Sequence, residues 1–143
     1  MNKWLLLVYK IPRHPTALRV SIWRKLKQLE SLLLHDSVWV LPLSTQTREQ
    51  FQWIAAEIIE IGGEATVWVS EMESERESER LTKAFSTKTD SAYKEILTKL
   101  RQKNPNLAVL ARRYQQVFAR DYFESPIGAK VRKALLAKGE KLS

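Results

Sequence analysis

Six cationic side chains in the second half of the chain are the residues best placed for a chemical role. They lie on two consecutive predicted amphipathic helices, outside the apolar stripes. Arginine and lysine in this arrangement can hold a phosphate backbone. A solvated helix face explains the pattern equally well. The candidate nucleic-acid ligands are Arg112, Arg113, Arg120, Lys130, Arg132 and Lys133.

No combination of residues predicts catalysis. The two histidines, His14 and His35, each lie in a predicted turn without a second ligand at metal spacing. Gly62 and Gly63 end a predicted helix and do not open one, so they do not form a phosphate-binding loop. The sequence contains no cysteine. We therefore predict a protein that is not an enzyme and that has no catalytic residue, no metal site and no cofactor.

The charge of the chain is divided unevenly. Of the 143 residues 44% are apolar, which is enough to bury a core. Residues 1–75 hold 8 Lys and Arg against 9 Asp and Glu, a net −1, whereas residues 76–143 hold 16 against 7, a net +9. The basic half predicts a polyanionic partner, and solubility alone is the competing explanation.

The N-terminal apolar run, Trp4–Tyr9, is too short to span a membrane and lacks the small-residue cleavage site of a signal peptide. The absence of cysteine fits a reducing compartment. We therefore predict a cytoplasmic protein without a membrane partner.

The first half, residues 1–72, has the order of elements of a ferredoxin-like β-α-β-β-α-β sheet. We predict Thr16 and Thr47 as helix caps, the latter in a capping box with Gln50, and a hairpin turn at residues 35–37. The predicted elements are the strand Trp4–Tyr9, a helix with the stripe Leu18, Ile22, Leu26 and Leu29, the strands Leu32–Leu34 and Val38–Leu41, a helix with the stripe Phe51, Ile54, Ala55 and Ile58, and the strand Thr66–Val69.

The second half predicts a charged linker over residues 73–80 and a helical appendage over residues 81–143. Asn104 and Ser125 each precede a proline and are predicted as helix caps. The last helix is expected to be short, with a loose tail after Gly139. The fold class is therefore α+β, a ferredoxin-like sheet followed by helices.

All five tryptophans fall in the predicted sheet unit. We favour core and rim packing for them, because large aromatic side chains dominate burial. A stacking platform for single-stranded nucleic acid is the alternative. The five are Trp4, Trp23, Trp39, Trp53 and Trp68.

Several segments together resemble the N-terminal domain of ChrB, the chromate-resistance regulatory family. The resemblance extends over nearly the whole chain, and it is the combination of segments that is specific. The segments are Trp4–Pro12, Arg19 with Trp23–Leu26, Asp36–Pro42, Thr47–Thr66, Arg112–Val117 and Arg120–Phe123.

A more distant resemblance, from Tyr9–Pro12 through Ser37–Val40, is to the ferredoxin-like domain of PaaX-type repressors and of CRISPR spacer-acquisition nucleases. Those nucleases carry a metal-binding aspartate where this chain has Lys10, and a protonated lysine cannot ligate a divalent metal. The resemblance thus implies the fold and argues against nuclease activity. We expect neither the winged-helix domain of the repressors nor the C-terminal domain of ChrB in this chain.

The resemblance implies a regulator linked to chromate resistance that binds DNA through its basic helices. A dimerisation or protein-interaction module without nucleic-acid contact is the alternative. Chromate or another oxyanion would need converging donors, for which Arg13, Arg19 and Arg24 are the candidates. A four-stranded sheet leaves open edges, so we expect a homodimer.

Overall fold

A computed structural model describes residues 2–142, with side chains described through residue 140. The chain divides into two compact units, Met1–Ser78 and Glu79–Ser143. The described part is α+β, with a four-stranded antiparallel sheet and five helices, as the sequence predicted.

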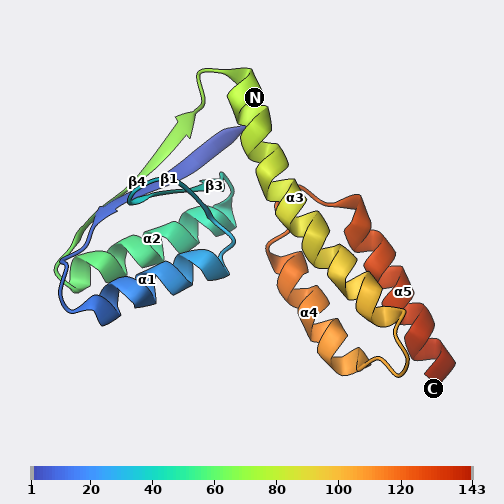
Figure 1. The fold of residues 1–143 in the computed structure, drawn as a ribbon. Helices are drawn as coiled ribbons and strands as arrows, with labels where there is room; N and C mark the ends of the chain where they lie inside the picture. Colours follow the sequence, from blue (N-terminus) through green and yellow to red (C-terminus); the bar gives the residue numbers. More distant parts are fainter. Residues whose placement is uncertain (1, 143) are drawn as a thin grey trace. The chain divides into compact units, whose positions relative to one another are not determined.

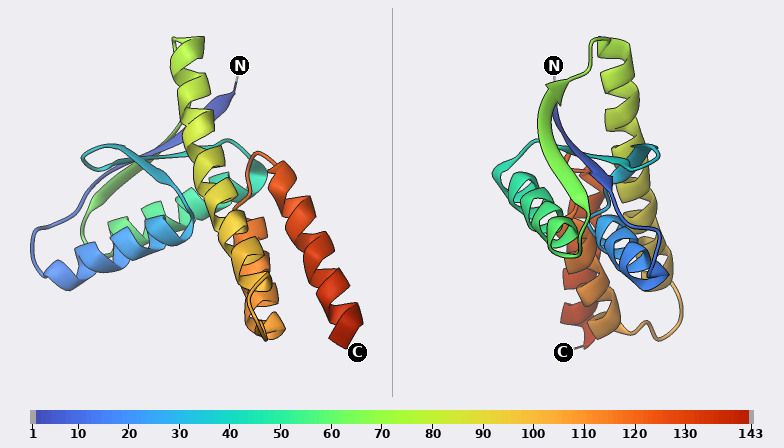
Figure 2. Two further views of the ribbon diagram at one scale, coloured as in Figure 1. Left: turned by 45° about the vertical axis from the view of Figure 1, so that its right-hand side comes forward. Right: turned by 90° about the vertical axis from the view of Figure 1, so that its left-hand side faces the viewer.

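The first unit is a sheet with two helices on one face (Figures 1 and 2). Within residues 3–71 the order of elements is β-α-β-β-α-β, and the strand order in the sheet is β2-β3-β1-β4. Each helix therefore connects two strands that are separated by a third. The elements are β1 (Lys3–Lys10), α1 (Thr16–Gln28), β2 (Leu32–His35), β3 (Val38–Pro42), α2 (Thr45–Glu60) and β4 (Glu64–Glu71).

Two of the three leucines of β1, Leu5 and Leu7, lie on the face of the sheet that the helices cover, because side chains alternate along a strand. Leu5 pairs with Leu41, and Leu7 pairs with Trp39; all four are buried. Burying a leucine side chain stabilises a fold by roughly 1.5–3 kcal/mol. The opposite face of the sheet includes Trp4, which is also buried and whose indole N–H donates to Ser78 Oγ at 3.1 Å.

Both predicted caps in this unit are wrong by position. Ser44 caps α2: its Oγ accepts from the Thr47 N–H at 3.1 Å, and Thr47 Oγ1 accepts from the Ser44 N–H at 2.9 Å. Thr47 is thus the third helical residue, and its hydroxyl also donates to the Pro42 carbonyl at 2.6 Å. Pro15 occupies the N-cap position of α1, where no side chain caps the helix.

The predicted turns of the first unit are confirmed. Asp36 and Ser37 connect β2 and β3, with Ser37 at φ 63°. Gly62 follows α2 at φ 92°, a left-handed conformation that costs glycine little.

Three helices form the second unit, α3 (Glu75–Leu100), α4 (Leu107–Ala119) and α5 (Pro126–Leu142). Figure 1 shows them packed alongside one another. The segment 73–80 is largely helical, since α3 begins at Glu75, and the boundary between the units falls inside that helix. Ser74 Oγ accepts from the Glu77 N–H at 3.3 Å at the start of this helix. The first turn contains Glu75 and Glu77, whose negative charge stabilises the helix through its dipole. The core residues are Tyr93, Ile96, Leu100, Leu110, Tyr114, Val117 and Val131.

Of the two predicted caps in the second unit, one is right. Asn106 caps α4, its Oδ1 accepting from the Val109 N–H at 3.2 Å, whereas Asn104 adopts φ 54° in the preceding turn. Ser125 does precede α5, and its Oγ accepts from the Ile127 N–H at 3.2 Å. With 17 residues, α5 is longer than predicted and continues past Gly139.

Candidate functional site

The two units carry opposite net charge. Met1–Ser78 holds 9 Lys and Arg against 10 Asp and Glu, a net −1. Glu79–Ser143 holds 15 against 6, a net +9. The excess positive charge of the chain therefore belongs to the helical unit.

The outer side of α4 combines small neutral side chains with arginines, and we call it the α4 surface. The buried residues Leu110, Tyr114 and Val117 lie on one side of α4, because an α-helix has 3.6 residues per turn. The remaining sides of the helix are exposed. Residues 96–120 contain six Lys and Arg and no Asp or Glu. No carboxylate within that segment therefore competes for its cations. The exposed residues of this surface are Ala108, Ala111, Arg112, Arg113, Gln115 and Ala119.

One flank of the α4 surface is a basic groove. The α3–α4 groove encloses about 300 Å³ and contains Lys99, Arg112 and Arg113. Lys99 pairs with Glu95 at 3.2 Å, with both side chains more than half exposed. Because exposed ion pairs are weak, Lys99 can exchange this partner for a phosphate.

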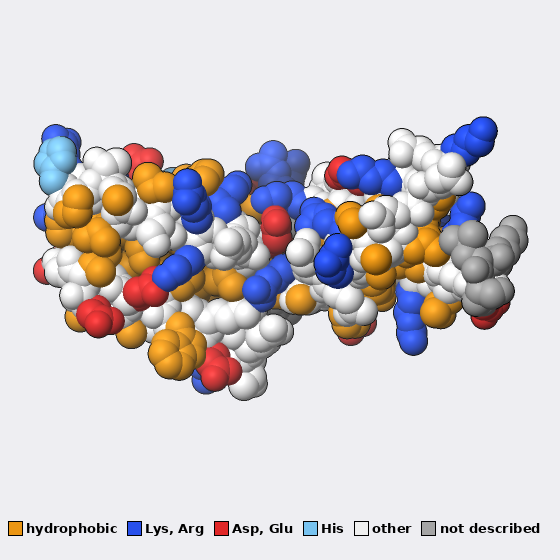
Figure 3. Space-filling view, turned by 90° about the horizontal axis from the view of Figure 1, so that it is seen from below, with side chains coloured by type: hydrophobic (Ala, Val, Ile, Leu, Met, Phe, Trp, Pro, Cys, Tyr) orange, Lys and Arg blue, Asp and Glu red, His pale blue; other side chains and the backbone are white. Residues whose placement is uncertain are grey.

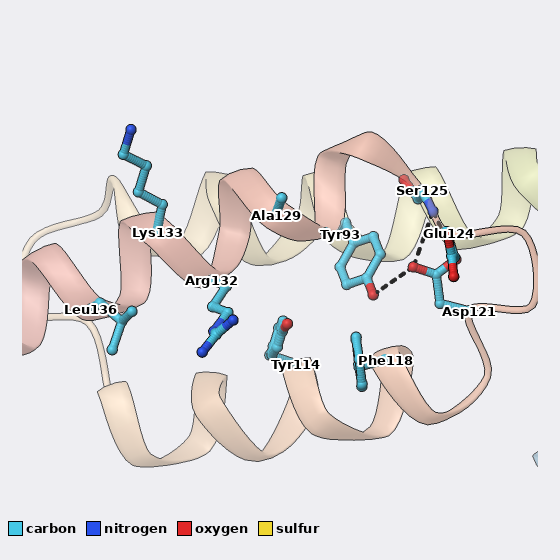
Figure 4. Close-up of a pocket in the computed structure, with 11 residues that line it drawn as sticks. Tyr93, Tyr114, Phe118, Asp121, Glu124, Ser125, Ala129, Arg132, Lys133 and Leu136 are labelled. Atoms are coloured by element: carbon cyan, nitrogen blue, oxygen red, sulfur yellow. Dashed lines mark hydrogen bonds between the residues drawn. The ribbon is translucent and has the colours of Figure 1, made fainter.

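The other flank is a larger pocket between α4 and α5. This α4–α5 pocket has a volume of about 580 Å³ and is drawn in Figure 4. Tyr114 and Phe118 form its α4 wall, with ring centroids 5.8 Å apart and an interplanar angle of 23°. Arg132 extends from α5 toward α4, whereas Lys133 points away from it (Figure 4).

The floor of the α4–α5 pocket is built by hydrogen bonds. The Tyr93 hydroxyl donates to Asp121 Oδ2 at 2.9 Å, and the Ser125 N–H donates to Asp121 Oδ1 at 2.9 Å. Ser125 Oγ donates in turn to Asp90 Oδ1 at 2.5 Å. Burial and the contact with Asp121 raise the pKa of Tyr93, so its phenol stays protonated and keeps donating. The floor is therefore a fixed polar network.

The first unit has one small cationic pocket of its own. This α1 pocket, about 360 Å³, contains Lys10 at the end of β1 and Thr16, Arg19 and Trp23 of α1. The Leu18 N–H donates to the Pro15 carbonyl at 3.2 Å, but no side chain caps α1, so the first two N–H groups of the helix remain available to an anion. Residues 1–29 contain seven Lys and Arg and no Asp or Glu. The segment that supplies all but one of the lining residues therefore contains no carboxylate, and the nearest acidic residue by strand register is Glu64, opposite Lys10 on β4.

The structure separates the predicted nucleic-acid ligands. The α3–α4 groove contains Arg112 and Arg113. The α4–α5 pocket, on the other flank of α4, contains Arg132 and Lys133 of α5. Arg120 is the half-buried C-cap residue of α4, and Lys130 is exposed on α5 and lines neither cavity. Between residues 2 and 140, none of these six side chains forms an ion pair.

The predicted anion ligands are also separated. Arg19 lines the α1 pocket, but Arg13 lies in the bend before α1, and Arg24 lies elsewhere on the exposed surface of the helix. Lys10 takes their place beside Arg19. By resemblance alone Lys10 is only a replaced metal ligand; the lack of carboxylates in residues 1–29 is the sequence signal for a cationic site there.

The tryptophan prediction is right only for part of the set. Trp4 and Trp39 are buried, whereas Trp23, Trp53 and Trp68 are more than half exposed. Figure 3 shows exposed apolar side chains on the helix side of the first unit, among Lys, Arg, Asp and Glu. The two exposed helix tryptophans, Trp23 and Trp53, thus add apolar surface to that unit.

The fold and the charge define the class of this protein. It has a sheet unit followed by a strongly basic three-helix unit. A family model described as Protein ChrB, N-terminal matches residues 19–119, more than two thirds of the chain. The chain therefore belongs to the ChrB N-terminal family, whose members are chromate-resistance-associated regulatory proteins. No curated protein and no solved structure matches it.

No helix among residues 2–142 is long and apolar enough to cross a membrane. The same residues contain no group of three or more His, Cys, Asp or Glu side chains that could hold a metal ion.

Proposed function

We propose that this chain is a cytoplasmic chromate-resistance-associated regulator whose second unit binds DNA through the α4 surface. The observation that carries the proposal is the +9 charge of that unit together with Arg112 and Arg113 of α4, which form no ion pair with any described side chain. Its first unit is a ferredoxin-like sheet in this proposal, and the chain performs no catalysis.

Phosphate contact is favoured by what surrounds the arginines. Arg112 and Arg113 are exposed and have no carboxylate partner among the described residues, so they lose no ion pair on binding phosphate. The exposed side of α4 carries short side chains, Ala108, Ala111 and Ala119, beside the arginines. A duplex backbone can therefore approach the α4 main chain closely while cations on both flanks contact its phosphates.

The α1 pocket supports recognition of an oxyanion such as chromate by the first unit. Lys10 and Arg19 would supply positive charge, and the uncapped first turn of α1 would supply N–H donors. Trp23 lines this pocket, so anion binding should change tryptophan fluorescence. Loss of the fluorescence response in Arg19→Gln but not in Arg48→Gln, an exposed arginine of α2, would support this assignment.

The alternative is a dimerisation or protein-interaction module, and exposed surface of the first unit favours it. β2 and β4 are the outer strands of the sheet, and Trp53 is 73% exposed on α2. Open strand edges and exposed tryptophans are typical of association surfaces. A homodimer is compatible with both functions, and light scattering at high micromolar concentration tests it.

The DNA proposal is tested by fluorescence anisotropy with two duplexes of unrelated sequence. Arg112→Gln/Arg113→Gln removes two charges from the α4 surface, and Arg24→Gln/Arg48→Gln removes two from the exposed surface of the first unit. At roughly 0.2–1 kcal/mol per exposed charge pair, the first variant should weaken both duplexes about twofold to thirtyfold. The control variant should bind like wild type.

Two outcomes would redirect the proposal. Weaker binding by the control alone would move the interface to the first unit. No binding by wild type at low salt would leave the interaction module in place of DNA binding.

A further inference from the structure

The α4–α5 pocket combines acidic, aromatic and basic side chains. Contact with a duplex phosphate backbone needs only the basic ones. Asp121 and Glu124 lie at one end, and Arg132 extends into the pocket toward the other end (Figure 4). The helical rise of 1.5 Å per residue places Arg132 roughly 10 Å along α5 from Ser125. The volume, about 580 Å³, is within the usual range of small-molecule sites.

An aromatic wall joins the two ends. Tyr114 is 7% exposed, but Phe118, stacked against it, is 59% exposed at the rim of the pocket. Figure 4 shows both rings between the acidic and the basic end. A flat ligand can extend this stack by one ring, and exposed aromatic side chains on which bases stack are a regular part of single-stranded nucleic-acid sites.

Contacts within the second unit hold the lining of the pocket in place. Tyr93 is fully buried and hydrogen-bonded to Asp121, which the Ser125 N–H also holds. Gly128 lets α5 approach the Tyr93 ring, since a Cβ there would lie 2.9 Å from two ring carbons. Asp121 Oδ2 accepts from the Tyr93 hydroxyl and also from the Ser125 N–H at 3.1 Å, whereas Oδ1 accepts only from the Ser125 N–H. Oδ1 therefore retains a further lone pair for a ligand N–H.

We propose that the α4–α5 pocket binds a nucleoside phosphate, either free or as an unpaired nucleotide of a single strand. The base stacks on Phe118, its N–H groups donate to the Asp121 and Glu124 carboxylates, and its phosphate pairs with Arg132. Guanine fits best, because its N–H donors lie side by side on one edge and match a carboxylate.

A ligand with only a phosphate-like group or only an aromatic ring would contact some of the lining side chains and leave the others without a partner. An inorganic oxyanion would pair with Arg132 but would leave Phe118 in water and would meet the two carboxylates. A neutral aromatic would cover Phe118 and leave Arg132 unpaired. Duplex DNA keeps its bases stacked and paired, so duplex binding at the α4 surface and this inference can succeed or fail separately.

Calorimetric titration of the full chain with GMP, AMP and ribose 5-phosphate tests the proposal. We expect GMP to bind more tightly than AMP and ribose 5-phosphate to bind weakest. Phe118→Ala should weaken GMP roughly 5- to 100-fold, and Phe118→Leu should weaken it nearly as much because it keeps bulk but no ring. Arg132→Gln should weaken GMP as well, whereas Lys130→Gln, which removes the same charge from α5 outside the pocket, should not.

The source of the ligand is decided by a guanine-containing single-stranded oligonucleotide. Much tighter binding than GMP, lost in Phe118→Ala, identifies a strand; binding no tighter than GMP identifies a free nucleotide. The inference is overturned if neither GMP nor the oligonucleotide binds, if ribose 5-phosphate binds as tightly as GMP, or if Phe118→Ala binds like wild type. Retained duplex binding by Phe118→Ala confirms that the variant is folded and that the α4 surface is intact.

Discussion

Replacing Gly128 with alanine should destabilise the second unit, although alanine is the better helix former. The added Cβ would lie 2.9 Å from two carbons of the Tyr93 ring, closer than carbon atoms approach without displacement. Tyr93 is fully buried and tied to Asp121, so it has little room to retreat. Overpacking of this kind costs about 1–3 kcal/mol.

Gly139→Ala is the matched control, because it lies in the same helix and a Cβ there meets nothing within 4 Å. Helix propensity favours both substitutions by up to about 1 kcal/mol. The difference between the two variants in free energy of unfolding therefore isolates the overpacking cost, about 1–3 kcal/mol. Urea denaturation followed by far-UV circular dichroism measures it. Equal stabilisation by both substitutions would refute the tight contact between α5 and Tyr93.

Further predictions concern single contacts in each unit. Tyr93→Phe should cost about 1.5–3 kcal/mol near neutral pH, because it removes a hydrogen bond to a carboxylate. The raised pKa of Tyr93 means that this stability is complete below the unfolded pKa of about 10 and is lost above it. Urea titrations should therefore show the two proteins converging above pH 10, and a constant difference would contradict this. Ser44→Ala should destabilise the first unit by about 1 kcal/mol through loss of the α2 cap. Tryptophan fluorescence reports it, since all five tryptophans lie in that unit, and Thr45→Ala, which removes an exposed hydroxyl beside the cap, should change little.

The sequence predicted the sheet unit well because its signals are local. The apolar run of β1, the hairpin turn before Val38 and the glycines after α2 each determine one element without help from distant residues. The caps were harder to predict, because three hydroxyl residues, Ser44, Thr45 and Thr47, lie at the start of α2. Burial of Thr47, which depends on packing against β3, settled the choice in favour of Ser44.

The candidate sites were predicted by charge but not by geometry. Lys and Arg clusters are visible in the sequence, yet only the packing of α4 between two neighbours shows that Arg113 and Arg132 lie on different flanks. The aromatic wall was missed for a related reason. The sequence pattern predicts that Tyr114 and Phe118 both belong to the apolar core stripe of α4. In the structure Phe118 is exposed, because α5 does not cover its ring.

The salt dependence of duplex binding by wild-type protein tests the central claim most directly. Each phosphate contact adds about 0.9 to the magnitude of the slope of log affinity against log salt. If all six candidate ligands, Arg112, Arg113, Arg120, Lys130, Arg132 and Lys133, contact phosphates, that slope is about −5. We predict a slope between about −3 and −5, the same for unrelated duplexes. Binding whose affinity does not change with salt, or no binding at low salt, would contradict the proposal that this family member holds DNA through its basic helices.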